Sequence, residues 1–252
     1  MLRKQIPNII TLSNLMCGVL AIVFLLQGHN PLLPSLLILL GAVFDFFDGM
    51  VARLLRVSSK IGVELDSLAD VITFGVAPST IAFRLVQQAI DNGWNVGATT
   101  EFIPYLALIM APLSAYRLGK FNVDERQTHC FLGLPTPMNA LFWLSIPLIV
   151  EVSENHNMFW GIPLYDLYDM FAIVLSNPWF VVIMAWLLGI LLVTELPLFS
   201  LKFKSLRWKE NVIPFTFLIL STLLILLFSV ISIPFIVFLY VLLSIISNTK
   251  YQ

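Results

Sequence analysis

The chain has 252 residues, of which 59% are hydrophobic and 12% are charged, and its formal net charge is −1. Because a soluble domain carries about 25% charged residues, so few charges exclude a water-facing surface over the whole chain. The near-neutral net charge also argues against a nucleic-acid partner. We therefore expect one all-α integral membrane domain over residues 1–252.

Eight apolar stretches are long enough to cross a membrane as helices. Pro234 and the total length of the last apolar region favour two spans with a tight turn near Ser229–Ser232 over one long helix. A seven-span count would place the C-terminus on the opposite side. Residues 154–177 fit either an external loop or a partial helix. The first six spans should form a core at residues 6–195, followed by a basic loop and two spans at 196–252. The expected spans cover residues 9–27, 32–53, 66–87, 102–119, 137–153, 178–195, 211–229 and 232–248.

Basic residues gather on one side of this eight-span arrangement. Of the 14 Lys and Arg residues, all except Arg84 fall at the N-terminus, at the C-terminus or in loops on that side. The opposite loops, near residues 88–101 and 154–177, carry acidic residues but no Lys or Arg. By the positive-inside rule, both termini and the 54–65 loop are expected in the cytoplasm. We expect the bacterial inner membrane as the location.

Four aspartates interrupt the apolar pattern of the second and third spans. Asp45 and Asp48 lie within the second span, and Asp66 and Asp70 lie at the start of the third. An aspartate near the centre of a span costs about 2.5–3.5 kcal/mol on insertion scales. Asp66 and Asp70 are separated by four residues, so they are neighbours on one helix face. Because a short loop joins the two spans, the four carboxylates should converge at the cytoplasmic end of an antiparallel helix pair.

The second span places further features on the face that carries its two aspartates. Asp45, Asp48, Gly49, Ala52 and Arg53 fit within an arc of about 140° on a helix. The two small residues let a ligand approach the backbone closely. The guanidinium of Arg53 suits a diphosphate, because it can donate two parallel hydrogen bonds to phosphate oxygens.

Oxygen ligands without His or Cys favour magnesium, manganese or calcium over zinc. A single aspartate at a span end is most simply an interfacial residue or a helix N-cap, and Asp66 alone fits both. Four aspartates at this spacing favour one shared site. A cation transporter could also gather carboxylates in a bundle, and it is the alternative from another functional class.

These residues form one pattern that resembles the signature of the CDP-alcohol phosphotransferases. It reads Asp45-Phe-Phe-Asp48-Gly49-Met-Val-Ala52-Arg53, eight residues, Gly62, three residues, Asp66, three residues, Asp70, with every fixed position present. The resemblance implies an intramembrane site for two Mg²⁺ or Mn²⁺ ions near the cytoplasmic side, and relatives of this kind suggest a homodimer.

The same resemblance implies roles for individual residues. Asp45, Asp48 and Asp66 would hold the metal ions, and Asp70 would contact a metal and accept the proton of the attacking hydroxyl. The pocket for the nucleotide and diphosphate of CDP-diacylglycerol would be lined by Gly49, Ala52, Arg53 and Gly62. Asn8 resembles a position that contacts the nucleotide, and a helix N-cap is its alternative role.

Three further segments resemble the phosphatidylserine synthase branch of the family. This branch implies transfer of a phosphatidyl group to L-serine with release of CMP. Glycerol 3-phosphate and inositol are the alternative acceptors. Arg117 or Lys120 is expected to bind the serine carboxylate, and Asn122 or an acidic neighbour its ammonium, although membrane anchoring also explains the two cations. The pattern often has Ala-Arg where this chain has Gly119-Lys120, and lysine lacks the planar fork of arginine. The segments are residues 6–14, residues 66–70 with 74–78, and residues 116–122 with 131–137.

Overall fold

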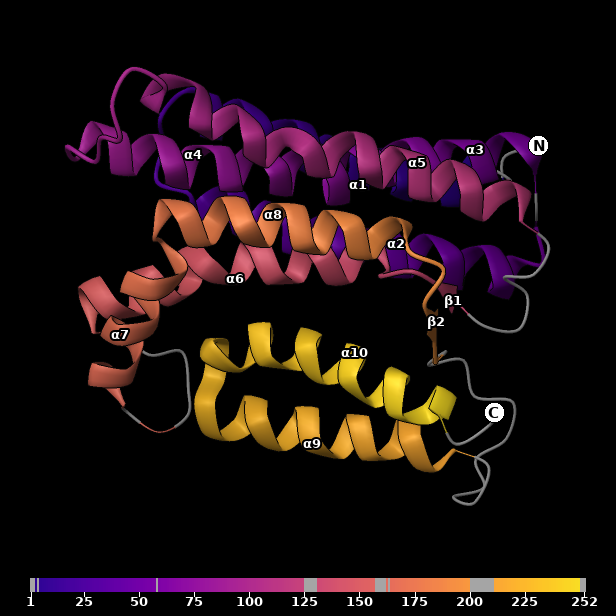
Figure 1. Ribbon diagram of the computed structural model, residues 1–252. Helices are drawn as coiled ribbons and strands as arrows, with labels where there is room; N and C mark the ends of the chain where they lie inside the picture. The colour runs from indigo at the N-terminus through magenta and orange to yellow at the C-terminus, as the bar shows by residue number, and fades with distance from the viewer. Residues whose placement is uncertain are drawn as a thin grey trace.

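The computed structural model describes residues 3, 5–57, 59–124, 131–156, 162, 164–199 and 211–249. Within these residues the chain is almost entirely helical, which confirms the expected all-α class (Figure 1). The only strands in this part are β1 (Phe131–Leu132) and β2 (Pro197–Leu198), which pair antiparallel. The helical elements are α1 (Gln5–Leu26), α2 (Leu32–Leu55), α3 (Lys60–Asp70), the π-helical segment η2 (Val71–Val76), α4 (Ala77–Asp91), the 3-10 helix η3 (Thr100–Ile109), α5 (Met110–Val123), α6 (Thr136–Asn155), α7 (Tyr165–Leu175), α8 (Pro178–Val193), α9 (Val212–Phe228), the 3-10 turn η6 (Ser229–Ile231) and α10 (Ser232–Thr249).

The number of membrane spans differs from the predicted eight in how the last stretch is counted. By length and composition, 6 helical stretches of the described residues could cross a membrane, or 7 if α7 and α8, bent by 74°, form one broken span. The last stretch, Val212–Ser247, counts once by length. It contains the turn η6, however, and α9 and α10 run back along each other (Figure 1). The predicted turn near Ser229–Ser232 is therefore confirmed, and residues 154–177, which fitted either an external loop or a partial helix, contain the helix α7.

The third stretch begins earlier than the sequence predicts. It runs from Lys60 to Asp91 through α3, η2 and α4, rather than starting at residue 66. The Ser59 hydroxyl accepts a hydrogen bond from the Gly62 backbone N–H at 3.0 Å and so caps α3. Asp66 consequently lies inside the helix, and the idea that it is a helix N-cap is wrong.

Close packing between α1, α2 and η2 fixes the helices that carry the aspartates. Thr73 of η2 lies between Gly18 of α1 and Gly41 of α2. A Cβ atom at Gly18 would lie 2.8 Å from the Thr73 Cα atom, and one at Gly41 would lie 2.6 Å from the Thr73 Cγ2 atom. Small residues are what allow membrane helices to approach this closely. The Thr73 hydroxyl also donates to the Asn14 carbonyl at 3.0 Å.

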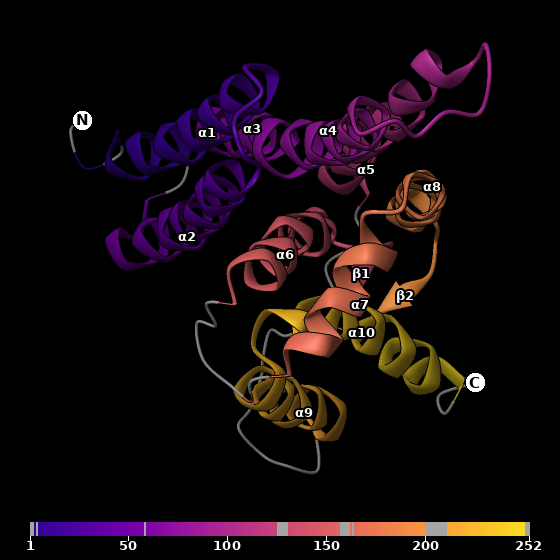
Figure 2. The same ribbon diagram turned by 90° about the vertical axis from the view of Figure 1, so that its left-hand side faces the viewer.

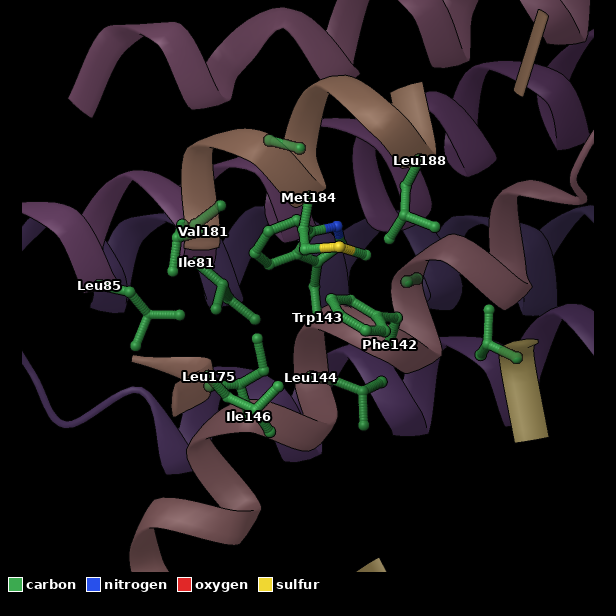
Figure 3. Packing of buried hydrophobic residues seen from close by; sticks show 14 of the residues in the cluster. Ile81, Leu85, Phe142, Trp143, Leu144, Ile146, Leu175, Val181, Met184 and Leu188 are labelled. Atoms are coloured by element: carbon green, nitrogen blue, oxygen red, sulfur yellow. The ribbon is translucent and has the colours of Figure 1, made fainter. Parts of the chain in front are cut away.

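The apolar core lies further along the bundle, away from the aspartates. Seen along the bundle, α6 lies between the group formed by α1 to α5 and the C-terminal pair α9 and α10 (Figure 2). Trp143 of α6 is fully buried and packs among side chains of α8 and α4, including Met184 and Ile81 (Figure 3). This core gives the bundle a rigid centre against which the ends of the helices are positioned.

Large apolar side chains also cover the outside of the bundle. On α8, for example, Trp179, Ile183, Leu187 and Ile190 are exposed. A water-facing surface would avoid such a continuous apolar face, whereas lipid tails solvate it. The outer surface therefore supports the membrane assignment independently of helix length.

The described basic residues, apart from Arg84, lie at or near one end of the bundle. α1 begins at this end and α10 finishes there (Figure 1). This is the arrangement that the positive-inside pattern predicts, and which side of the membrane the end faces stays a prediction. The described residues concerned are Arg3, Arg53, Arg56, Lys60, Arg117 and Lys120. Lys4, Arg126, Lys202, Lys204, Arg207, Lys209 and Lys250 lie outside the described residues.

Candidate metal and nucleotide site

Three of the four predicted aspartates meet at the end of the bundle where α2 finishes and α3 begins. Asp45, Asp48 and Asp66 each offer a carboxylate oxygen, and these oxygens lie within 4.8 Å of one another. Asp48 is 6% exposed, and the other two are partly buried. The predicted convergence of carboxylates from two antiparallel helices is thus present for these three residues.

The hydrogen bonds of this trio leave one of its carboxylate oxygens without a partner. The Thr11 hydroxyl of α1 donates a hydrogen bond to Asp48 Oδ2 at 2.5 Å. Asp66 Oδ1 is buried and has no hydrogen-bond partner among the described residues. Three carboxylates at this separation repel one another, and an unpaired buried oxygen adds a desolvation cost. The oxygen donors and the orphaned atom fit a divalent cation such as Mg²⁺ or Mn²⁺.

Asp70 stands apart from the trio, one helical turn further along α3. It is 9% exposed, and its Oδ1 accepts a hydrogen bond from the Asn14 amide at 3.3 Å. Asn14 is itself tied to η2, because its carbonyl accepts the Thr73 hydroxyl. A carboxylate that is buried and oriented by a neutral donor is suited to accept a proton from a substrate hydroxyl.

A cavity of about 200 Å³ opens beside the trio and collects most of the residues predicted to hold the nucleotide. Its lining contains Asp48 and Asp66 together with four of the five residues expected to contact CDP-diacylglycerol: Asn8, Gly49, Ala52 and Gly62. The remaining lining residues are Pro7, Thr11, Val57, Ser59 and Val63.

Gly49 leaves open space at one wall of this cavity, whereas Gly62 is closely packed in the other wall. A Cβ atom at Gly49 would meet only the Arg53 guanidinium, at 3.9 Å, so this wall is open. At Gly62 it would lie 2.9 Å from the Ser59 hydroxyl and 3.1 Å from Asn8 Oδ1. Arg53 is exposed and does not line the cavity, but its guanidinium lies next to Gly49.

Asn8 lies in the first turn of α1, which begins at Gln5. Its amide donates to the Gln5 side chain at 3.2 Å. Because α1 starts three residues before it, the alternative role of Asn8 as a helix N-cap is wrong.

Of the three residues predicted to bind serine, two already bond to other side chains and the third is buried. Lys120 forms an ion pair of 2.8 Å with Glu195, and the Asn122 amide donates to the Ser67 hydroxyl at 2.9 Å. Arg117 is 7% exposed. Its guanidinium stacks on the Phe121 ring at 5.5 Å from the centroid.

Arg117 also interacts electrostatically with the base candidate, Asp70. Its guanidinium is within electrostatic range of Asp70 and of Tyr240 on α10. In the described part of the chain no carboxylate comes within ion-pair distance of Arg117, and its Nε atom is buried without a hydrogen-bond partner. A buried cation with spare donors is suited to an anionic group of a ligand.

Two polar residues of α1 belong to the site but were not identified from the sequence. Thr11 contacts the trio and Asn14 contacts Asp70. With Asn8 they form a polar row at intervals of three residues within a mostly apolar helix. That spacing follows one face of a helix, so the periodicity of polar residues in the first span was the available signal.

The comparisons with known proteins agree with the pattern in the sequence. The family model described as CDP-alcohol phosphatidyltransferase matches residues 4–166. This segment contains the trio, Asp70, the residues of the cavity and Arg117, whereas α9 and α10 lie outside it.

Three curated relatives illustrate the similarity, and each is named CDP-diacylglycerol–serine O-phosphatidyltransferase. The protein from Bacillus subtilis is 43% identical over 139 residues, which cover 55% of this chain and 72% of the relative. The protein from Helicobacter pylori is 34% identical over 157 residues, covering 62% and 61%. The protein from Saccharomyces cerevisiae is 37% identical over 166 residues, covering 60% and 56%. The chain therefore spans less than two thirds of the length of the last two.

Proposed function

This chain belongs to the CDP-alcohol phosphatidyltransferase family, and we propose that it transfers the phosphatidyl group of CDP-diacylglycerol to L-serine, with release of CMP and formation of phosphatidylserine. The observation that carries the proposal is the carboxylate trio opening onto a cavity lined by the residues of the family pattern. The activity named for the relatives from three organisms supports serine as the acceptor.

The metal site would be formed by Asp45, Asp48 and Asp66, with two Mg²⁺ or Mn²⁺ ions. Bound there, the ions would neutralise the diphosphate and stabilise the negative charge on the departing CMP. Thr11 holds one carboxylate in place through its hydrogen bond to Asp48. A direct metal contact by Asp70 stays a prediction, since Asp70 lies outside the trio.

The cavity would hold the cytidine diphosphate part of the lipid. Gly49, Ala52 and Gly62 present little side-chain bulk, so the diphosphate can approach the backbone of α2 and α3. The exposed guanidinium of Arg53 would bind phosphate oxygens in a bidentate manner. Asn8 offers an amide, which can both donate to and accept from a nucleotide base. The acyl chains would lie in the bilayer.

Asp70 would act as the general base. The acceptor hydroxyl attacks phosphorus and passes its proton to the Asp70 carboxylate, while the bond from phosphorus to the CMP oxygen breaks. Asn14 orients this carboxylate by donating to Oδ1. Burial of Asp70 keeps water from competing with the acceptor alcohol.

Serine would bind next to Asp70 on the side of α5. Arg117 is the strongest candidate for its carboxylate, because this guanidinium is buried and within range of Asp70. Lys120 and Asn122 stay as candidates, but each would have to leave its bond to Glu195 or Ser67. Because only a few basic residues lie near, a phosphate-bearing acceptor would be held less well.

The remaining expectations concern the setting of the enzyme. We propose that it resides in the bacterial inner membrane with both termini and the active site on the cytoplasmic side, where serine is available. The gathering of basic residues at the site end of the bundle supports this orientation. A homodimer is proposed from family resemblance.

The direct test uses protein purified in detergent, CDP-diacylglycerol and either Mg²⁺ or Mn²⁺. L-serine, glycerol 3-phosphate and inositol are added separately, and CMP is measured. Release of CMP with serine alone is the expected result, and it should disappear in Asp48→Asn. Release with glycerol 3-phosphate or inositol but not with serine would overturn the acceptor. Cation flux in proteoliposomes without any CMP release would show that the protein is a cation transporter and not an enzyme.

A further inference from the structure

Two fully buried polar side chains at the start of α6 have no partner within the described chain. Thr136 and Asn139 are both 0% exposed. The Thr136 hydroxyl oxygen and both the oxygen and nitrogen of the Asn139 amide lack hydrogen bonds among the described residues. Leaving a buried donor or acceptor unpaired costs about 1–3 kcal/mol, so three such atoms within one turn of helix need an explanation.

Some other buried hydroxyl groups of the bundle are satisfied locally, whereas those of Ser114 and Ser221 also lack a hydrogen bond among the described residues. Ser145, further along the same helix, donates to the Phe142 carbonyl at 2.6 Å. Ser35 of α2 donates to the Pro31 carbonyl at 2.8 Å. Thr136 is the first residue of α6, so no preceding helical turn offers a carbonyl to it. The Thr136 hydroxyl can therefore find a hydrogen-bond partner only outside α6.

The start of α6 is held firmly against the end of α8. The backbone N–H of Gly133 donates to the Leu196 carbonyl at 3.0 Å, and that of Leu134 donates to the Leu191 carbonyl at 2.9 Å. Gly133 has a φ of 76°, which disfavours other residues, and a Cβ atom there would lie 2.4 Å from the Leu192 carbonyl oxygen. The unpaired groups are thus attached to a fixed part of the structure.

A second cavity at the far end of the bundle shows how the helices line up. Pro31, which directly precedes α2, and Glu151 of α6 both line it. Moving along these two helices from there toward the aspartates, 15 residues correspond to about 22 Å. The positions reached are residue 46 on α2 and residue 136 on α6. Thr136 therefore lies at about the same height in the bundle as Asp45.

The contact between α6 and α10 relates Asn139 to Tyr240, which is a neighbour of Arg117. The Phe142 ring of α6 meets the Phe238 ring of α10 with 6.0 Å between centroids. The two helices are antiparallel (Figure 1), so the turn of α6 that carries Asn139 lies level with Tyr240. Tyr240 is within electrostatic range of Arg117, which is also within range of Asp70. α6 packs against both η2 and α10, so these residues belong to elements that contact one another or share Tyr240 as a neighbour.

We propose that Thr136 and Asn139 are specificity-determining residues that bind the polar groups of the acceptor, together with Arg117, where α6 meets η2 and α10. The inference rests on the proposed function, since it concerns the acceptor of the same reaction. Arg117 and the positive end of the α6 dipole favour the carboxylate of an amino acid. The Asn139 amide oxygen accepts a hydrogen bond from the ammonium, and the Thr136 hydroxyl bonds to the carboxylate.

This arrangement matches a zwitterion better than a phosphate ester or a polyol. An amide offers a donor and an acceptor side by side, which suits neighbouring ammonium and carboxylate groups. One buried guanidinium balances one carboxylate, whereas a phosphate carries up to two negative charges. The chain would thus select against phosphate-bearing acceptors by the small number of cations in the pocket.

The test compares Asn139→Leu and Thr136→Val, which keep approximate size but remove the polar atoms, with wild type. The measured quantities are kcat and the KM values for L-serine and CDP-diacylglycerol, by CMP release. We expect the serine KM to rise roughly tenfold or more in each variant, with the KM for CDP-diacylglycerol changed less than about twofold. Ser145→Ala is the matched control, since its hydroxyl is equally buried on α6 but already paired, and it should leave both KM values unchanged.

Two serine analogues show which residue contacts the ammonium of serine and which contacts its carboxylate. Wild type should use serine far better than 3-hydroxypropionate, which lacks the ammonium, and better than ethanolamine, which lacks the carboxylate. Asn139→Leu should shrink the preference over 3-hydroxypropionate, and Arg117→Ala should shrink the preference over ethanolamine.

Thermal denaturation keeps the result interpretable, because a purely structural pair of residues would move the melting temperature and not the serine KM. Folded variants with a wild-type serine KM and unchanged analogue preferences would overturn the inference while wild-type activity with serine upholds the proposed function. Wild type that releases no CMP with serine would overturn both.

Discussion

Replacing Gly41 with alanine tests whether the close packing around Thr73 sets the position of Asp70. The new Cβ atom would lie 2.6 Å from the Thr73 Cγ2 atom and 2.9 Å from Asn14 Oδ1. Ordinary contacts between such atoms need about 3.5–4.0 Å. The helix α2 and the segment η2 must therefore separate by about 1 Å. Asp70 lies three residues before Thr73 and bonds to Asn14, so both of its supports are displaced.

The expected loss is much larger in rate than in stability. Overpacking costs about 1–3 kcal/mol, and alanine regains up to about 1 kcal/mol over glycine within a helix. The net destabilisation is therefore at most about 2 kcal/mol. A displacement of about 1 Å at a reacting group, in contrast, lowers the rate on the order of 100-fold. We expect kcat for CMP release to fall by about this factor, with the fold retained in thermal denaturation.

Second-site changes separate this effect from general damage. Thr73→Ser removes the Cγ2 atom but keeps the hydroxyl that donates to the Asn14 carbonyl, so it should restore most of the activity of Gly41→Ala. It should not rescue Gly18→Ala, whose nearest contacts are Thr73 Oγ1 at 2.5 Å and Cα at 2.8 Å. Gly119→Ala is the control, since no atom lies within 4 Å of its added Cβ. A folded Gly41→Ala variant with wild-type kcat would refute the reasoning.

Further predictions concern the carboxylates and cations. Asp70→Asn should lower kcat at least about 100-fold, because it removes the base, while equilibrium binding of CDP-diacylglycerol stays near wild type; lost binding would contradict this role. A chelator should abolish CMP release and added Mg²⁺ or Mn²⁺ should restore it, with Asp66→Asn needing more metal for half-maximal rate than wild type; an unchanged requirement would remove Asp66 from the metal site. Arg117→Ala should raise the serine KM far more than Lys120→Ala, whose pair with the 60% exposed Glu195 contributes less than about 1 kcal/mol to stability; the reverse ranking would favour Lys120 as the carboxylate ligand.

The sequence identified the centre of the site because intramembrane carboxylates are costly and therefore few. Asp45, Asp48 and Asp66 could be placed together from helical spacing and a short connecting loop alone, and the structure brings their oxygens within 4.8 Å. Helical spacing also put Asp66 and Asp70 on one face. It did not separate their roles, since the neighbours that distinguish them come from α1 and α5.

The features that the sequence did not reveal depend on contacts between distant elements. Lys120 bonds to Glu195, which lies 75 residues away in the sequence. No local sequence pattern predicts that the end of α5 and the segment after α8 lie side by side. The complete burial of Thr73 between two glycines depends on how three helices pack. Asn139 resembles an ordinary polar residue at a helix start until its burial and lack of partners are seen. The polar row of α1 was readable from its period of three residues, but an apolar average over the span conceals it.

Asp70 lies outside the trio, so the site has two sides, which is what the proposed phosphatidyl transfer requires. Asp66 belongs to the group that faces the nucleotide cavity, and Asp70 lies about 6 Å further along the same helix, toward Arg117. The leaving CMP and the entering hydroxyl must occupy different sides of the phosphorus atom. Asp70 is oriented by the neutral amide of Asn14, and its place on the side of Arg117 is the one that its proposed role as the base for the entering hydroxyl requires.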